Sequence, residues 1–140
     1  MADFFSSMRV SASGLDAQMK RMNTISSNIA NAETPGYKRK DPEFSATADR
    51  ESFGDILQNK VDENTQGVLV TDVREDVKPG RMIYKPEDPH ANDEGYVEMP
   101  NVNPVQEMAD MISAQRSYEA NVTAIGAATQ MANKALELGR

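Results

Sequence analysis

Both ends of this chain carry apolar residues at alternating spacings of three and four, and no other feature limits its fold as strongly. Near the start, the pattern links Phe5, Met8, Ala12, Leu15, Met19, Met22, Ser26 and Ile29. A period near 3.5 residues is typical of a narrow coiled-coil seam rather than of a broad core face. The pattern predicts a long N-terminal helix within residues 1–33. Its serines and Gly14 lower the helix propensity, so we expect this helix to need a partner.

A second seam lies near the end of the chain. It links Met108, Met111, Gln115, Tyr118, Val122, Ile125, Thr129, Ala132 and Leu136. Asn103 can cap a helix there, and Pro104 suits the first helical position because its missing N–H would have no partner in any case. We therefore predict a C-terminal helix within residues 103–140. Beyond Ile125 the seam consists mainly of alanine and threonine, which permit close helix approach but bury little area.

The segment between the helices, residues 34–102, is predicted to be a turn-rich and β-rich insert. It holds 6 of the 7 prolines, and its 9 basic and 15 acidic residues carry most of the chain's net charge of −7. Residues 45–66 lack periodicity, so we expect a loop-like stretch with one turn of helix near residues 53–57.

Five short segments of the insert have the patterns of strands or turns. The alternation along residues 67–76 predicts a half-buried strand. We expect a second strand over 37–44 and a third over 95–99. A turn at Lys78-Pro79-Gly80-Arg81 is predicted to return residues 82–84 as the partner of 67–76.

These predictions combine into an α+β fold. Long N- and C-terminal helices pack as a coiled-coil-like pair, and a small β-rich irregular insert lies between them. Apolar residues make up only 39% of the 140 residues, which is a thin supply for a core. We therefore expect the chain to complete its burial against partner subunits.

Composition excludes several functional classes. The net charge of −7 argues against a general affinity for nucleic acid or for an anionic membrane. The chain has no cysteine, so thiol catalysis, disulfides and iron–sulfur clusters are excluded. No apolar run approaches the ~20 residues of a membrane span, so we expect no direct membrane insertion. The first residues also lack the basic and apolar regions of a cleaved secretory signal.

No catalytic motif is present, and we predict neither an enzyme nor a bound cofactor. The one histidine, His90, lies among Glu87, Asp88, Asp93 and Glu94. Their spacing does not match a calcium-binding EF-hand loop. A solvated turn bounded by prolines is favoured over a metal site.

The methionines of the two seams leave two interpretations open. The favoured one is an internal core between the two helices. The other is an adaptable surface that contacts several non-identical neighbours, which suits the flexible and polarizable methionine side chain.

The segment SSNIANAETPGYKRK is the most informative part of the chain. Asn28 and Asn31 lie where the N-terminal helix should end, and Thr34-Pro35-Gly36-Tyr37 cannot continue a helix. We expect a tight turn with a positive φ at Gly36, followed by a strand. The basic end, Lys38-Arg39-Lys40, is either a contact patch or a solvated strand edge.

This segment resembles the signature of the bacterial flagellar axial proteins, the family of rod, hook and hook-associated proteins. Their motif reads approximately A-N-x-x-T-x-G-Y, and the matching turn residues here are Ala30, Asn31, Thr34, Pro35, Gly36 and Tyr37. The segment Ser11–Leu15 and the run from Gly95 to Asn121 are also similar to the family. The short length resembles the proximal rod proteins rather than the longer distal rod or hook proteins.

The resemblance implies a structural subunit of the proximal rod of the flagellar basal body. Such a subunit would assemble into a helical tube that spans the periplasm, transmits motor torque to the hook and lines the export channel. The implied partners are copies of the chain, other proximal and distal rod proteins, the rod–membrane-ring junction protein and the flagellar type III export apparatus. Export would proceed without cleavage of a signal peptide.

The two terminal segments would then form the axial core of the rod, with the insert farther out. We expect the assembly contacts to come from the apolar seam residues: Phe5, Met8, Leu15, Met19, Met22, Ile29, Met108, Met111, Tyr118, Val122, Ile125 and Leu136. An alternative from another class is a soluble adaptor or export chaperone that docks through the same helices.

Overall fold

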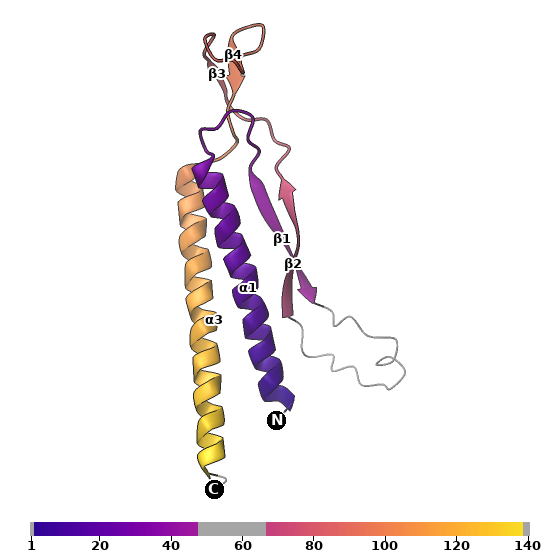
Figure 1. Cartoon of the computed structure of the whole chain (residues 1–140), viewed down its shortest axis with the longest axis vertical. Helices are drawn as coiled ribbons and strands as arrows, with labels where there is room; N and C mark the ends of the chain where they lie inside the picture. Colours follow the sequence, from indigo (N-terminus) through magenta and orange to yellow (C-terminus); the bar gives the residue numbers. More distant parts are fainter. Residues whose placement is uncertain (1, 48–66, 139–140) are drawn as a thin grey trace, which may run out of the picture.

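Two long helices dominate the computed structural model, which describes the backbone of residues 2–47 and 67–138. Helix α1 spans Ala2–Ala30 and helix α3 spans Pro104–Leu138, and the two lie side by side along most of their length (Figure 1). Both predicted helices are confirmed. At 1.5 Å per residue, α1 is about 44 Å long and α3 about 52 Å. The predicted turn of helix near 53–57 lies outside the described residues.

Asn103 caps α3 as its sequence predicts. Its side-chain Oδ1 accepts the backbone N–H of Val105 at 3.1 Å, and Pro104 occupies the first helical position. The first turn of α3 lies beside the last turn of α1, where the Asn28 side chain donates to Glu107 (Figure 1). The two helices therefore share one well-defined end.

Small side chains bring the two helices together. Ala17 of α1 is 2% exposed and Ala114 of α3 is fully buried. Ile25 is the one large apolar side chain of α1 that is fully buried among those described. Close approach at alanines buries little area per residue, so the helix pair of a single chain has a thin core.

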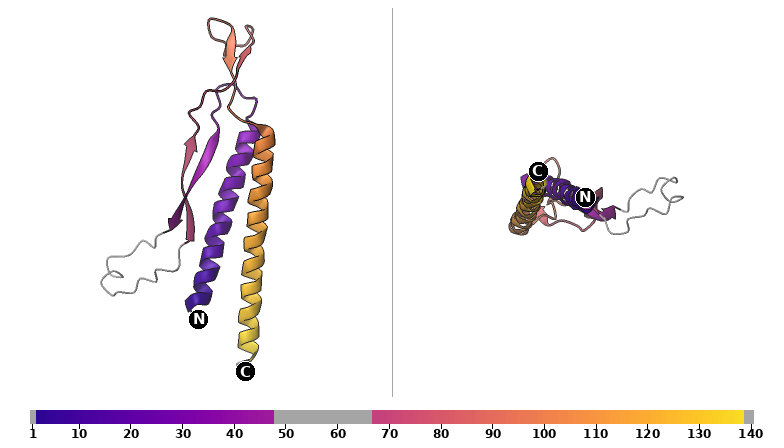
Figure 2. Two further views of the ribbon diagram at one scale, coloured as in Figure 1. Left: turned by 180° about the vertical axis from the view of Figure 1, so that it is seen from behind. Right: turned by 90° about the horizontal axis from the view of Figure 1, so that it is seen from below.

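Strands β1 (Lys40–Thr47) and β2 (Gly67–Glu75) form an antiparallel ribbon. The ribbon runs along the side of α1 that faces away from α3 (Figures 1 and 2). The backbone N–H of Val68 donates to Ser13 Oγ at 3.0 Å, which fixes part of the ribbon to the helix. Both predicted strands exist, but the expectation of loop at residues 45–47 is wrong because β1 continues through them.

Strands β3 (Met82–Tyr84) and β4 (Tyr96–Glu98) pair with each other and project beyond the end of the helix pair (Figure 1). The predicted strand over 95–99 is therefore confirmed, whereas the predicted pairing of 82–84 with 67–76 is wrong. β2 pairs with β1 alone, and β3 belongs to a separate two-stranded sheet with β4. The expected reversing turn around Pro79 is instead a link that carries the chain onward.

Gly80 allows this link to pass in close contact with the backbone of the segment after β4. A Cβ atom at Gly80 would lie 1.6 Å from the backbone oxygen of Met99. The link and the segment after β4 therefore cross in direct backbone contact. The backbone N–H of Met99 also donates to the Arg81 oxygen at 2.9 Å, so the crossing is tied by a hydrogen bond.

Candidate assembly interface

Asn28, in the last turn of α1, is 1% exposed and uses every polar position of its amide. Its Nδ2 donates to the Lys40 backbone oxygen at 2.8 Å and to Glu107 Oε2 at 3.1 Å. Its Oδ1 accepts the Lys40 N–H at 2.9 Å and the Tyr37 hydroxyl at 3.0 Å. Asn28 thus bonds to the outer edge of β1 as a neighbouring strand would. It joins α1 to β1 and to α3 at once.

Glu107, near the start of α3, is the second buried polar side chain and is also 1% exposed. Its Oε1 accepts a hydrogen bond from Arg39 Nε at 2.6 Å, and Arg39 forms a further ion pair with Asp41. The Ser27 hydroxyl lies 3.2 Å from the Tyr37 hydroxyl and extends the network. We call the side chains of Ser27, Asn28, Tyr37, Arg39 and Glu107 the polar joint.

The charge on Arg39 is secure in this environment. Burial on its own lowers the pKa of the guanidinium, but the hydrogen bond and the charge of Glu107, together with Asp41, outweigh burial and raise the pKa. The buried carboxylate of Glu107 is therefore opposed by a permanent positive charge. A compensated ion pair of this kind is costly to break from one side only.

The motif turn leads from α1 into the polar joint. Gly36 has a φ of 74°, which confirms the predicted positive value. Nothing lies within 4 Å of the place where its Cβ would be, so the backbone conformation rather than space requires glycine. The Asn31 side chain donates to the Ser27 oxygen at 2.8 Å and accepts the Thr34 hydroxyl at 3.3 Å. The turn is thereby closed on the end of the helix.

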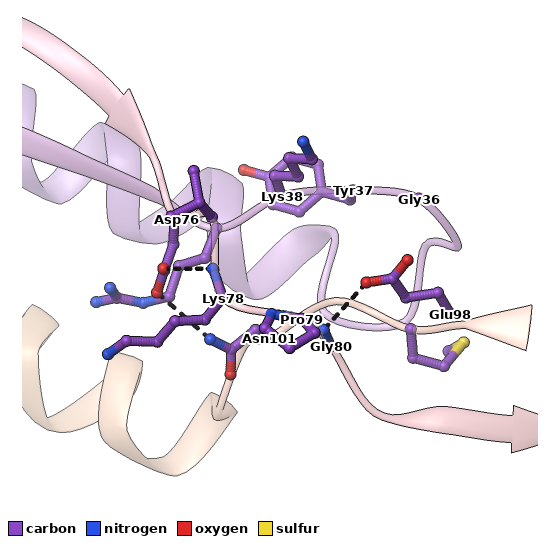
Figure 3. A pocket seen from close by; sticks show the side chains of 12 residues that line it. Gly36, Tyr37, Lys38, Asp76, Lys78, Pro79, Gly80, Glu98 and Asn101 are labelled. Carbon is purple, nitrogen blue, oxygen red and sulfur yellow. Dashed lines mark hydrogen bonds between the residues drawn. The ribbon is translucent and has the colours of Figure 1, made fainter.

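The turn, the link after β2 and the segment after β4 enclose a cleft of about 250 Å³ (Figure 3). Asp76 accepts hydrogen bonds from the Lys78 N–H and from the Asn101 side chain, and Glu98 accepts one from the Gly80 N–H. The last two bonds join the link after β2 to the segment at the end of β4, and the Gly36 N–H joins the motif turn to the same place by donating to the Glu98 backbone oxygen at 3.3 Å. The cleft is thus part of the junction between the helix pair and the β3–β4 hairpin.

The predicted seam residues of α1 do not form the core between the helices. Met8, Leu15, Met22 and Ile29 are only half-buried, and Met19 is 47% exposed. The side chain of Phe5 lies outside the described residues. The buried face of α1 consists instead of Ala17, Ile25 and Asn28, because this helix contacts both α3 and the ribbon.

The seam residues of α3 divide into two groups. Met111, Tyr118 and Ile125 are half-buried. Met108, Val122 and Leu136 are 54%, 47% and 70% exposed. The favoured interpretation of the methionines as an internal core therefore fails for Met19 and Met108.

Four exposed apolar side chains lie on one side of α3, from its first turn to just past its middle. They are Val105, Met108, Ile112 and Val122, and we call them the outer face of α3. Exposed apolar rows of this kind are typical of protein–protein contact surfaces. The structure thus leaves an apolar surface free along one helix while the joint at its end is complete.

The described surroundings of His90 do not form a metal site. Its side chain is exposed, and its Nδ1 lies 3.0 Å from Asp88 Oδ1. In residues 2–47 and 67–138, no three histidine, aspartate or glutamate side chains gather closely enough to hold a metal ion. None of the helices in these described ranges has both the length and the apolar character of a membrane span.

Four members of the polar joint, Ser27, Asn28, Arg39 and Glu107, are not among the site residues that the sequence predicts. The sequence marks Asn28 only as the end of a helix, and Glu107 fits the first turn of any helix. Arg39 belongs neither to a contact patch nor to a solvated edge, because it turns inward to Glu107. A polar residue such as Asn28 on the inner side of an apolar helix was the one available signal.

Two family models match the chain at its two ends. The model described as "Flagella basal body rod protein" matches residues 8–38. The model described as "Flagellar basal body rod FlgEFG protein C-terminal" matches residues 93–138. Asn28 and Tyr37 lie in the first matched segment and Glu107 in the second, so the polar joint connects the two.

Curated relatives match almost the whole chain. The flagellar basal-body rod protein FlgC of Bacillus subtilis is 44% identical over 147 aligned residues, covering 97% of this chain and 98% of the relative. FlgC of Aquifex aeolicus is 40% identical and covers 98% of both chains. FlgC of Escherichia coli O6:H1 is 36% identical and covers 94% of both. The chain belongs to the FlgC family of flagellar basal-body rod proteins.

Proposed function

We propose that this chain, a structural rod subunit of the flagellar basal body, assembles in the proximal rod through the sides of its helix pair. The observation that carries the proposal is the outer face of α3, whose valine, methionine and isoleucine side chains are 47–77% exposed in the single chain. Burial of such a face against a neighbour supplies the main driving force of association.

In this proposal the seam residues of α1 and α3 are the contacts between subunits. Residues 1–33 and 103–140 form the axial core of a helical tube, and residues 34–102 lie farther out. Contacts between different faces of successive subunits do not close into a ring, so they build an open tube. Stiffness for torque transfer to the hook then comes from many long helices packed side by side around the export channel.

The proposed partners are copies of the chain, other proximal and distal rod proteins, the rod–membrane-ring junction protein and the flagellar type III export apparatus. The thin core of the helix pair supports export of a partly folded chain, without a cleaved signal, into the periplasm-spanning rod. The entropy lost on ordering is then offset by burial at the growing end.

The relatives reported above are named rod proteins, which leaves the adaptor or export-chaperone alternative without support. They are also structural proteins rather than enzymes. We accordingly propose no catalytic role for any side chain of this protein.

Electron microscopy of basal bodies from a strain that lacks this chain tests the proposal. We expect the membrane ring and the export machinery to be present with no rod extending from them. A complete rod and hook in that strain would overturn the proposal and return attention to an adaptor.

A pair of substitutions on α3 tests the contact surface itself. Val122→Asp places a carboxylate on the outer face, and we expect it to prevent incorporation into the rod. Ala124→Asp, two residues on and about 200° around the helix, introduces the same charge at another exposed position. Equal incorporation of the two variants, measured in purified basal bodies, would remove the outer face from the interface.

A further inference from the structure

The β3–β4 hairpin, residues 81–99, has one buried and one exposed face. The cross-strand pairs place Ile83 and Val97 on the first face, and Val97 is 1% exposed. They place Met82, Tyr84 and Tyr96 on the second face, where these side chains are 54%, 62% and 40% exposed. The hairpin therefore presents an apolar and aromatic surface that no described part of the chain covers.

The exposed face is ordered before any partner arrives. The Tyr84 and Tyr96 rings lie edge to face with their centroids 5.3 Å apart. The Lys85 N–H donates to the Gly95 oxygen at 2.9 Å, and the Asn92 side chain accepts the Tyr96 N–H at 2.8 Å. A surface that is already ordered loses little conformational entropy when it binds. Tyrosines in such positions often contribute much of a binding energy.

The attachment of the hairpin is also stiff. Its base passes through the crossing at Gly80, where the two chain segments touch backbone to backbone. Buried Met99 and Pro100 follow β4 at the same place. The hairpin projects past the end of the helix pair, away from both chain termini (Figure 1). A surface held in this way can fix the position of a neighbouring molecule.

Charge decides which kind of molecule fits the surface. Residues 81–99 contain two basic and five acidic side chains by sequence. Glu87 and Glu94 are exposed and form no ion pair with any described residue. A second copy of this chain would bring a net charge of −7 to an already acidic surface. Like charges at a contact are unfavourable, whereas a basic partner gains attraction and faster association.

We propose that the exposed hairpin face, formed by Met82, Tyr84 and Tyr96, docks on a basic surface of a neighbouring basal-body protein other than a copy of this chain. The tyrosines and the methionine make the centre of the contact. Glu87 and Glu94, in the exposed loop that joins β3 to β4, pair with lysine or arginine of the neighbour. The proposal rests on the place of the chain in the rod, and it assigns the hairpin a contact separate from the outer face of α3.

A photo-crosslinking amino acid tests the contact in assembled basal bodies. Benzoylphenylalanine replaces Tyr84 in cells that carry the otherwise complete protein, and the purified basal bodies are irradiated. We expect a crosslink to another protein, through a peptide that contains lysine or arginine, identified by mass spectrometry. The same reagent at Val77, which is 89% exposed but lies outside the hairpin, gives the background.

A neutralised variant tests the role of charge. We expect Glu87→Gln/Glu94→Gln to reduce the Tyr84 crosslink about fivefold, as two solvent-exposed ion pairs allow. The matched control, Glu33→Gln/Glu75→Gln, also removes two exposed carboxylates and should leave the yield unchanged. Absence of the neutralised chain from basal bodies that retain the control chain supports the proposal as well.

Three results would overturn the inference. They are a crosslink from Tyr84 to a second copy of the chain, a yield no higher than that at Val77, and an equal yield in the neutralised and control variants. The proposed function is tested separately, because presence of the chain in purified basal bodies does not depend on what the hairpin touches.

Discussion

The two ends of the helix pair are built in different ways. At the end near the hairpin, Asn28 and Glu107 are each 1% exposed, and polar groups from α1, the motif turn, β1 and α3 bond to one another. Along the rest of the pair, the buried side chains are small, such as Ala17 of α1 and Ala114 of α3, and larger side chains such as Val122 remain exposed.

This difference shows which part of the molecule one chain can complete. The polar joint has its hydrogen-bond partners within the chain, so it fixes the angle between the helices and the ribbon without outside help. The remainder of the helix pair exposes apolar surface that only a neighbour can cover. We infer that the joint specifies shape, whereas the long helices supply the surface for assembly.

The largest expected effect comes from replacing glycine by alanine at the backbone crossing near the hairpin, compared with the same replacement in α3. Gly80→Ala would place a Cβ on the Met99 oxygen, and we expect a loss of about 4 kcal/mol in the free energy of unfolding. Gly126→Ala, in α3, meets nothing within 4 Å and should instead stabilise the helix by about 0.5–1 kcal/mol. Denaturant unfolding of the purified chains measures both.

The comparison fails if both alanine variants change stability in the same direction. A tolerated alanine at Gly80 would mean that the backbone crossing at Met99 is not part of the native structure. A destabilising alanine at Gly126 would mean that α3 is tightly covered at that position.

Local signals in the sequence predicted the elements, and contacts between distant segments decided the rest. Asn103, Pro104 and Gly36 act through their own backbone, so the start of α3 and the motif turn were predictable. Whether residues 82–84 pair with β2 or with β4 depends on the path that the chain takes after β2. Nothing local distinguishes those two choices.

The candidate site divides in the same way. The seam periodicity predicted the two helices correctly, but it did not predict which side of each helix is buried. The joint of Asn28, Arg39 and Glu107 was not predicted, because the bonds that join Glu107 to Arg39 and to Asn28 connect residues 68 and 79 positions apart along the chain. Each residue taken alone suits an ordinary helix end or strand edge.

The polar joint itself can be broken from one side or replaced from both. Glu107→Leu leaves Arg39 without its main partner, and we expect a loss of about 3 kcal/mol in the free energy of unfolding. Glu107→Leu combined with Arg39→Met should recover much of that loss, since two apolar side chains of similar size replace the pair. A double-mutant cycle by denaturant unfolding measures the coupling.

If the stability losses of the single variants Glu107→Leu and Arg39→Met add up to the loss of the double variant, Arg39 and Glu107 are not coupled. The polar joint would then not act as a unit. A further measurement separates stability from shape. We expect the double variant to be stable but poorly incorporated into basal bodies, because the angle between the helices and the ribbon is no longer fixed.

A smaller effect is expected at the motif turn. Gly36→Val forces a β-branched residue into a φ of 74°, at a cost of about 1–2 kcal/mol. Gly36→Asn should lose less, since asparagine tolerates this region and no neighbouring atom blocks its side chain. Thermal unfolding ranks the variants, and equal losses would show that crowding rather than φ sets the requirement.

The smallest effect concerns the tip of the hairpin. The backbone N–H of His90, and then its ring, bond to Asp88 and lower the pKa of that carboxyl below its ordinary value. The stabilising interaction is thus present above the ordinary pKa and is lost as the pH falls through the lowered one. In His90→Ala the backbone bond remains, so an NMR titration should show only a partial rise of the Asp88 pKa. A full return to the ordinary value would mean that the backbone bond is absent.

Amide hydrogen exchange, measured on the free chain and on purified basal bodies, tests the contrast between the two regions most directly. We predict slow exchange around Asn28, Lys40 and Glu107 in both states. We also predict that amides along residues 8–22 and 118–136 exchange rapidly in the free chain and slowly in the rod. Equal protection of both regions in the free chain would contradict the account, because the helix pair would then be complete without a neighbour.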